Sequence, residues 1–427
     1  MTFQSQFLLL GQRRFLPLFI TQLLGAFNDN VFKNALVILI TFELATKSGS
    51  DPRLMVTAAA GIFILPFFLF SATAGQVADR FDKARVIRFV KLVEIVLMLS
   101  ATVGLQLQSA NFLLFILFMM GAQSAFFGPL KYAILPDHLA RDELISGNGL
   151  IQAATFLAIL IGTLVGGLFI LTHDGAVIIS VIVVSLAIAG WLASCAIPAT
   201  TAASPGLKIK WNFLAVTWSM VAYGARHREI FRPTLAISWF WLVGATFLAQ
   251  LPTFGKESLG GDEEVVTLLL LVFSIGIGTG SLLCNRLLRG EIRLRYVPFG
   301  AIGISLFALE LYFASAGSLP VQTEDTLGAT RFLSGWTGCR IVLDMFLIAL
   351  SGGIYVVPLN AAIQARSENA HRARNVAVLN VFNALFMVVS AVASALLLAL
   401  DFTVPELFLT LALVNLGAAF FTAKSLA

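Results

Sequence analysis

The sequence has little charge and few polar aromatic residues. Only 12% of its 427 residues are Asp, Glu, Lys or Arg, about half the share in an ordinary soluble domain, whereas 58% are hydrophobic. The chain has five Tyr and 37 Phe, so most of its aromatic surface lacks a hydroxyl group and must face lipid or packed protein. These shortages exclude a soluble globular enzyme and leave a polytopic membrane protein.

Cysteine and histidine are scarce too, and neither is arranged for covalent or metal chemistry. The three cysteines lie far apart with no CxxC pair, and the four histidines show no metal-ligand spacing. No Walker-type glycine loop is present, which excludes ATP-driven transport by this chain alone. We therefore expect no catalytic residue, no metal and no cofactor, and we interpret Cys195, Cys284 and Cys339 as packing residues.

Long apolar runs, bounded by Gly, Pro, Asn or charge clusters, predict twelve membrane-spanning helices. A span needs roughly 20 apolar residues, and hydropathy places the runs at 15–42, 54–78, 86–106, 112–135, 148–171, 175–197, 233–254, 265–285, 296–317, 341–364, 375–400 and 405–423. The longest polar connection, 198–232, separates an N-terminal six-helix half, 1–197, from a C-terminal six-helix half, 233–427. The predicted fold class is an all-α integral membrane protein.

Lys and Arg concentrate in alternate connections. They are frequent near 80–91, in 198–232 and near 286–295, and we count Lys91 with the first of these groups. The intervening connections hold few, such as Lys256. Because cytoplasmic loops retain Lys and Arg, we expect the central loop 198–232 and both termini to be cytoplasmic. The net charge of +5 follows this topology and forms no patch, so we expect no nucleic-acid partner.

A short internal repeat supports a duplicated architecture. Residues 129–134 read Pro-Leu-Lys-Tyr-Ala-Ile and residues 358–363 read Pro-Leu-Asn-Ala-Ala-Ile, so four of six positions match. The two segments lie in the fourth and tenth predicted helices, which a six-plus-six duplication would superimpose. We therefore predict two pseudo-symmetric six-helix halves related by an axis along the membrane normal.

The segment 75–85, Gly-Gln-Val-Ala-Asp-Arg-Phe-Asp-Lys-Ala-Arg, resembles the signature loop between helices 2 and 3 of the major facilitator superfamily. The resemblance implies the major facilitator fold, with 12 transmembrane helices. It also implies a conformational gating role for Gly75, Asp79, Arg80 and Arg85, which would latch the cytoplasmic side of the N-terminal half in the outward-open state. A positive-inside anchor alone would account for the two arginines but not for Gly75 and Asp79.

Four further motifs resemble the bacterial lysophospholipid transporter family, and this resemblance covers essentially the whole chain. They are Gln-Leu-Leu-Gly-Ala-Phe-Asn-Asp-Asn-Val-Phe-Lys-Asn at 22–34, Gly-Pro-Leu-Lys-Tyr at 128–132, Asn-Gly-Leu at 148–150 and Gly-Ile-Tyr-Val-Val-Pro-Leu-Asn at 353–360. Members flip lysophospholipid, chiefly lysophosphatidylethanolamine, to the inner leaflet of the bacterial inner membrane, where an acyltransferase/acyl-ACP synthetase re-acylates it. The resemblance implies a monomer whose partners are lysophospholipid, membrane lipids and that enzyme.

Candidate substrate-binding residues are Asp29, Asn30, Lys131 and Asn360. Asp29 lies near mid-helix, where an acidic side chain costs at least roughly 2.5 kcal/mol unless it faces a partner or a cavity. It either pairs with Lys33 one turn on or, as the family motif favours, contacts the ammonium of an ethanolamine headgroup. Lys131 either snorkels to the interface or supplies a charge for the phosphate, and its repeat partner Asn360 offers a neutral amide.

Other acidic residues keep an alternative open. Glu94 and Glu310 are possible sites for proton or Na⁺ coupling, whereas Asp344, four residues after Arg340, favours a structural pair. The alternative function is proton-coupled efflux of drugs or another amphiphilic small molecule, with Glu94 or Glu310 as the proton site. A membrane-embedded acyltransferase is the hypothesis from another class, but the HxxxxD-like segment 138–143 ends in Glu rather than Asp.

Overall fold

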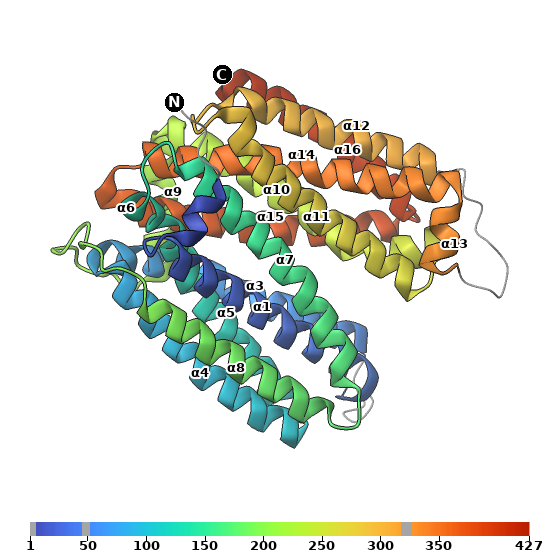
Figure 1. The fold of residues 1–427 in the computed structure, drawn as a ribbon, viewed down its shortest axis with the longest axis horizontal. Coiled ribbons are helices and arrows are strands. Elements are labelled where there is room, and N and C mark those ends of the chain that lie inside the picture. The colour runs from blue at the N-terminus through green and yellow to red at the C-terminus, as the bar shows by residue number, and fades with distance from the viewer. Residues whose placement is uncertain (1–5, 45–51, 317–326, 427) are drawn as a thin grey trace. The chain divides into compact units, whose positions relative to one another are not determined.

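The computed structural model describes residues 6–44, 52–316 and 327–426, and these are almost entirely helical (Figure 1). The long helices are α1 (Leu16–Leu39), α3 (Pro52–Arg80), α4 (Lys83–Leu107), α5 (Ala110–Ala133), α7 (Leu144–Ile170), α8 (Gly175–Cys195), α10 (Arg228–Thr253), α11 (Glu263–Leu288), α12 (Val297–Ala316), α14 (Trp336–Arg366), α15 (Arg372–Ala399) and α16 (Val404–Leu426). The shorter helices are α6 (Leu135–His138), α9 (Phe213–Arg226) and α13 (Ala329–Ser334). Each of the twelve predicted runs corresponds to one long helix, so the predicted all-helical fold class is confirmed.

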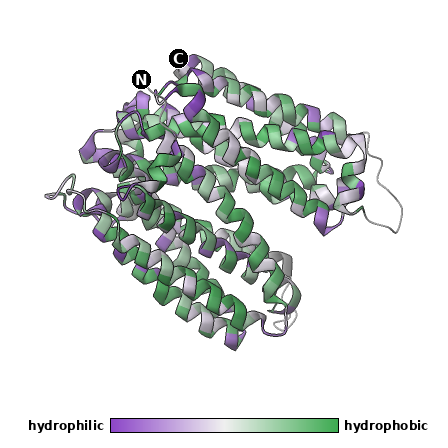
Figure 2. Ribbon diagram, in the orientation of Figure 1, coloured by the Kyte–Doolittle hydropathy of each residue, from purple (hydrophilic) through white to green (hydrophobic). Residues whose placement is uncertain are grey.

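Eleven of the described helical segments are long and apolar enough to cross a membrane. The long helix outside that set is α4, which carries Lys83, Arg85, Arg88, Lys91 and Glu94 within its first half. Hydrophobic residues dominate the long helices, and hydrophilic residues gather at helix ends and connections (Figure 2). Large apolar side chains are exposed on the outer faces, including Phe89 at 66% and Phe299 at 68%. An exposed phenylalanine surface of this kind fits a lipid environment.

Capping residues explain where several helices begin and end. Asp82 accepts a hydrogen bond from the Ala84 N–H at the start of α4, and Asp262 accepts from the N–H groups of Glu264 and Val265 at the start of α11. Gln108 and Arg289 adopt the left-handed conformation just after α4 and α11, which terminates each helix. The connections are therefore defined by local hydrogen bonding as well as by hydropathy.

The chain divides into two compact units. Unit 1 comprises Met1–Gly147, Leu157–Phe231 and Ile363–Ala384, and unit 2 comprises Asn148–Phe156, Arg232–Ala362 and Leu385–Ala427. Both units draw residues from each side of the central connection, because part of α7 lies in unit 2 and the first half of α15 lies in unit 1. The division into two pseudo-symmetric halves, 1–197 and 233–427, therefore stays a prediction.

Unit 1 is built around the packing of α3 along α5 and of α8 against α1 and α4. Its apolar core includes Phe32 and Leu36 of α1, Met98 of α4 and Ile116 of α5. Because this core surrounds α1, the polar residues that follow one another in the middle of that helix must be satisfied inside the bundle.

Unit 2 contains stacked aromatic rings and a polar cluster around Asn415. Phe247 of α10 stacks on Phe408 of α16 with ring centroids 4.5 Å apart. Asn415 of α16 accepts a hydrogen bond from Trp239 Nε1 at 2.7 Å and donates to the carbonyl of Ala301 and to Ser305 Oγ of α12. The buried amide thus joins three helices with its hydrogen-bonding groups satisfied.

Glycines let α11 and α14 approach closely in unit 2. A Cβ atom at Gly280 would lie 2.0 Å from the backbone oxygen of Leu350, and one at Gly353 would lie 2.5 Å from that of Ile277. The obstacles are backbone atoms, which cannot swing aside as a flexible side chain can. The two helices therefore pack backbone to backbone, as small residues permit in membrane proteins.

We predict that Gly280→Ala destabilises the protein, because the new methyl group forces α11 away from α14. The expected loss is about 1–3 kcal/mol, typical of overpacking, measured as a lower midpoint of thermal unfolding of the protein in detergent. Gly244→Ala in α10 is the matched control, since a Cβ atom added there would meet nothing within 4 Å beyond its chain neighbours and the backbone of its own helix. Equal midpoints for Gly280→Ala and Gly244→Ala would contradict the close packing.

Candidate functional site

Asp29 of α1 lies against α5 in unit 1. Its Oδ2 atom accepts a hydrogen bond from Ser124 Oγ at 2.7 Å. The Lys33 ammonium lies over the ring of Phe63, 5.7 Å from the ring centroid. The direct partner of Asp29 is therefore a hydroxyl group of α5, and the intrahelical Asp29–Lys33 ion pair considered above is not among the ion pairs of the described residues.

Glu94 of α4 lies at the centre of a buried polar cluster. Lys91 Nζ donates to Glu94 Oε2 at 2.6 Å, and both side chains are only 1% exposed. Asn28 Nδ2 of α1 donates to Oε1 at 3.0 Å, and Gln123 Nε2 of α5 donates to Oε2 at 3.0 Å. One carboxylate thus binds three helices together, and Lys91 compensates its charge.

The burial of Lys91 was not predicted from the sequence. We counted it with the cytoplasmic loop charges, but its ammonium is buried and lies 4.8 Å from the centroid of the Phe127 ring. Gly25 of α1 provides the space, since a Cβ atom there would lie 2.2 Å from Lys91 Nζ. The signal in the sequence was Glu94 three residues later, a spacing that puts the two side chains on one helix face.

One acceptor in this cluster is open. The Asn28 Oδ1 atom is buried and has no hydrogen-bond partner in the part of the chain that the structure describes. It belongs to the residue next to Asp29, and its amide nitrogen is held by Glu94. An unsatisfied acceptor at this depth favours binding of a donor such as an ammonium group.

The other candidate substrate residues are distributed over both units. Lys131, in the last turn of α5, lies 5.1 Å from the centroid of the Tyr132 ring and interacts electrostatically with Asp29 and Lys91. Asn30 donates to the Ala26 carbonyl of its own helix at 2.8 Å. Asn360 belongs to unit 2 and donates to the Val356 carbonyl of α14 at 3.3 Å. Asp29, Asn30 and Lys131 therefore belong to unit 1 and Asn360 to unit 2, and the binding roles of all four remain predictions.

The signature segment contacts the start of α15 within unit 1. Asp79 is fully buried, and its carboxylate accepts hydrogen bonds from Arg374 Nε at 2.9 Å and from the Ala373 N–H at 3.1 Å. Gly75 lies one turn earlier, where a Cβ atom would be 2.7 Å from the Ala377 Cβ. The missing side chain of Gly75 and the charge of Asp79 therefore both serve the packing of α3 on α15.

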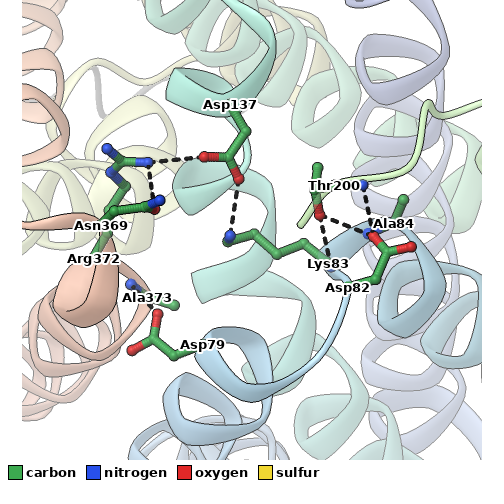
Figure 3. A network of polar contacts seen from close by, with 9 residues as sticks. All are labelled: Asp79, Asp82, Lys83, Ala84, Asp137, Thr200, Asn369, Arg372 and Ala373. Atoms are coloured by element: carbon green, nitrogen blue, oxygen red, sulfur yellow. Dashed lines mark hydrogen bonds and ion pairs between the residues drawn. The ribbon is translucent and has the colours of Figure 1, made fainter. Parts of the chain in front are cut away.

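A second carboxylate joins α4, α6 and α15 beside this contact (Figure 3). Asp137 accepts from Lys83 Nζ at 2.8 Å and from Arg372 Nη1 at 3.0 Å. Asp82 caps α4 and also accepts from the N–H and hydroxyl groups of Thr200, at 2.9 Å each (Figure 3). Sequence reasoning missed Asp137 and its partners, because they come from segments far apart in the chain.

The two signature arginines do not join this network. Arg80 lies over the ring of its neighbour Phe81, 5.2 Å from the centroid, and Arg85 is exposed. Of the four predicted gating residues, the structure therefore brings Gly75 and Asp79 to α15. The gating role of all four stays a prediction.

The second predicted coupling residue, Glu310 of α12, is ion-paired with Arg340 of α14 in unit 2. The structural pair that we expected between Arg340 and Asp344 is replaced by this contact between helices. Asp344 is buried, and its Oδ2 atom has no hydrogen-bond partner within the described ranges. Coupling roles for Glu94 and Glu310 stay predictions.

The fold and the buried polar groups define a class of protein. Long apolar helices surround ionisable side chains at membrane depth, which is typical of multi-pass membrane transporters. Among the described residues, no group of three or more His, Cys, Asp or Glu side chains is arranged to hold a metal ion.

The chain belongs to the Major Facilitator Superfamily, whose family model matches residues 18–391. It is a membrane transporter and not an enzyme. It is similar to the lysophospholipid transporter LplT of Escherichia coli O1:K1, with 29% identity over 364 residues that cover 83% of this chain and 81% of the relative. The LplT protein of Salmonella newport is also 29% identical, over 368 residues that cover 84% of this chain and 82% of the relative.

Solved structures support the fold alone. The human organic anion transporter MFSD10 (TETRAN) superimposes with a TM-score of 0.76 at 13% identity, covering 96% of this chain and 99% of that one. The fucose:proton symporter FucP of E. coli gives a TM-score of 0.72 at 13% identity, covering 99% of both chains. The predicted major facilitator fold is therefore confirmed.

We predict that Lys91→Met destabilises the protein strongly, because it leaves the Glu94 carboxylate buried without its cation. Breaking a buried pair costs about 3–5 kcal/mol, and the midpoint of thermal unfolding in detergent should fall accordingly. The double variant Lys91→Met/Glu94→Gln should recover much of this loss, since no uncompensated charge remains. Lys33→Met is the control, because it removes a lysine that belongs to none of the ion pairs of the described residues. If the loss of stability in the double variant equals the sum of the losses in the two single variants, the coupling between Lys91 and Glu94 is refuted.

The Asp82 cap predicts that the stability of the fold depends on pH. Burial raises the pKa of Asp82, but hydrogen bonds from Thr200, Ala84 and Arg85 outweigh burial and hold the pKa below its ordinary value. A carboxylate with a depressed pKa stabilises the fold at pH values above its unfolded pKa of about 3.9, and this contribution is lost as pH falls through the depressed value.

We therefore expect Asp82→Ala to destabilise the protein at neutral pH by about 1 kcal/mol. The difference from wild type should shrink as the pH falls below about 4, because protonation then removes the same acceptor from the wild type. The measurement is thermal unfolding across this pH range. Asp174→Ala is the matched control, since Asp174 occupies the N-cap position of α8 without a side-chain hydrogen bond. If the destabilisation by Asp82→Ala does not change with pH, the charge of the carboxylate is not responsible for the stabilisation.

Proposed function

We propose that this chain is a lysophospholipid transporter that moves lysophosphatidylethanolamine-type lipids across the bacterial inner membrane by alternating access. Re-acylation on the cytoplasmic side, by an acyltransferase/acyl-ACP synthetase partner, would then regenerate a phospholipid. The similarity to two proteins named lysophospholipid transporters, over more than four fifths of the chain, supports this cargo.

The observation that carries the proposal is the unequal compensation of two carboxylates in unit 1, the buried Glu94 and the half-buried Asp29. Glu94 has a full cation, Lys91, at 2.6 Å and two amide donors. Among the described residues, Asp29 has one hydrogen-bond donor, the hydroxyl group of Ser124, and the charges of Lys33 and Lys91 act on it without an ion pair. An intramembrane carboxylate that forms no ion pair within the described chain favours a cationic ligand. In the proposal, Asp29 therefore binds the ethanolamine ammonium, and the open Asn28 Oδ1 beside it is a second acceptor.

The phosphate of the headgroup requires a cation, and Lys131 supplies it in the proposal. Its charge interacts with that of Asp29, so the two ends of a zwitterionic headgroup find opposite charges within one environment. Asn30 and Asn360 use an N–H each on their own helices, and each amide keeps a carbonyl oxygen and a second N–H for the ligand. The acyl chain would lie against apolar residues or remain in lipid.

The transport cycle in this proposal moves two six-helix halves, 1–197 and 233–427, with 198–232 and both termini on the cytoplasmic side. The contact of Asp79 with Arg374 and the close approach at Gly75 support a latch at this end of α3. Arg80 and Arg85 would engage only in another conformation of the cycle. The proposed working unit is a monomer.

We predict that reconstituted wild-type protein accelerates the movement of labelled lysophosphatidylethanolamine between the leaflets of liposomes, followed by albumin extraction. Asp29→Asn should slow this movement at least about tenfold, because a hydrogen bond to a charged group contributes about 1.5–3 kcal/mol. Asp401→Asn, an isosteric change at an exposed position with φ of 62°, is the control and should transport at the wild-type rate.

Diacyl phosphatidylethanolamine tests the specificity of this activity and should not be accelerated. A wild-type rate in folded Asp29→Asn would remove Asp29 from the mechanism. If lysolipid movement is not accelerated at all, and a proton gradient instead drives efflux of a drug-like amphiphile, the alternative function holds and Glu94 and Glu310 become the groups to test.

A further inference from the structure

A cavity of about 210 Å³ lies in unit 1 between the end of α3, the segment before α9 and the start of α15. Its polar lining comes from Gln76, Lys208, Lys210, Ser219, His371, Arg374 and Asn375. Among the described residues that line it, none is Asp or Glu. A concave site lined by several cations and no acid favours an anionic ligand.

The cations at this cavity are available to a ligand. Within the described chain, the ion pairs involve neither Lys208 nor Lys210, whose side chains are exposed. Arg374 uses Nε on Asp79 and Nη2 on the Ala370 carbonyl, so other N–H groups of its guanidinium remain. An anion here would bind a guanidinium that already holds the signature carboxylate.

The wall that carries the lysines is held in place by α3. Gln76 Oε1 accepts from the backbone N–H of Lys210 at 3.0 Å, and Gln76 Nε2 donates to the Lys210 carbonyl at 3.2 Å. This pair of bonds fixes the extended segment against the helix. The site is therefore ordered before any ligand binds, which reduces the entropy cost of binding.

The neighbouring helix α9 indicates what kind of molecule carries the anion. Val216 and Met220, one turn apart, are buried against Ala72 and Val378. Trp218, which lies on the opposite face, is 76% exposed, and Trp211 before the helix is 74% exposed. A helix with an apolar inner face and exposed tryptophans is typical of the membrane interface, so the anion at this depth belongs to a lipid headgroup.

We propose that this cavity binds the phosphate of an anionic phospholipid whose acyl chains lie beside α9, with Lys208, Lys210 and Arg374 as its cations. The bound phosphate shares the Arg374 guanidinium with Asp79 and thereby acts on the contact between α3 and α15. This site is separate from the Asp29 cluster, and binding here does not depend on which cargo the transporter moves.

The test measures binding of phosphatidylglycerol to the purified full chain in detergent, by native mass spectrometry and by thermal unfolding. Each basic residue near an anionic lipid contributes roughly a fivefold gain in affinity, so Lys208→Gln/Lys210→Gln should bind about 25-fold more weakly. The double variant Lys256→Gln/Lys424→Gln removes the same charge from exposed positions outside the cavity and should bind as wild type does.

Two further arms identify the ligand. Phosphatidylcholine, which has no net charge, should bind weakly to all three proteins, and inorganic phosphate should compete only at far higher concentration than the lipid. Equal binding of phosphatidylglycerol to wild type and to Lys208→Gln/Lys210→Gln would overturn the site. Inorganic phosphate that binds as tightly as the lipid would overturn its assignment to a membrane lipid.

Discussion

A carboxylate buried among apolar helices must find compensation, and this requirement organises unit 1. Glu94 meets it with Lys91, Asn28 and Gln123, which join α4 to α1 and α5. The pair needs space as well as charge, and Gly25 supplies that space by lacking a side chain. Removal of either ion leaves the other buried without a partner. The packing of α1 against α4 therefore depends on this ion pair, and so does the position in the bundle of Asp29, which α1 carries.

The same requirement acts at the end of α3. Asp79 has no exposed surface and relies on Arg374 and the Ala373 N–H, whereas Asp137 relies on Lys83 and Arg372. These ion pairs connect segments from both sides of the central connection within one compact unit. At this end of α3, ion pairs and the close packing of Gly75 on Ala377 therefore act together to hold the helices.

The long helices and the buried acids were predictable from the sequence, because hydropathy and the cost of an intramembrane charge are local properties. Asp29 and Glu94 were identified in this way. Lys91 was not, since counting charges near helix ends treats any lysine there as a loop residue, and its burial depends on Gly25 of another helix. Asp137 and Arg372 were missed for a related reason, because a contact across 235 residues leaves no periodic signal.

Charge balance also separates the two proposed lipid sites. At the proposed substrate site, the carboxylate of Asp29 lies near the cations Lys33 and Lys131, so charges of both signs are present for the two ends of a zwitterionic headgroup. A headgroup that carries only negative charge would have no partner for Asp29, whose carboxylate would repel it. The cavity beside α9 has the opposite balance, with cations and no acid among its described lining residues. One chain can thus distinguish a zwitterionic cargo from an anionic membrane lipid by the presence or absence of a carboxylate beside the cations of each proposed site.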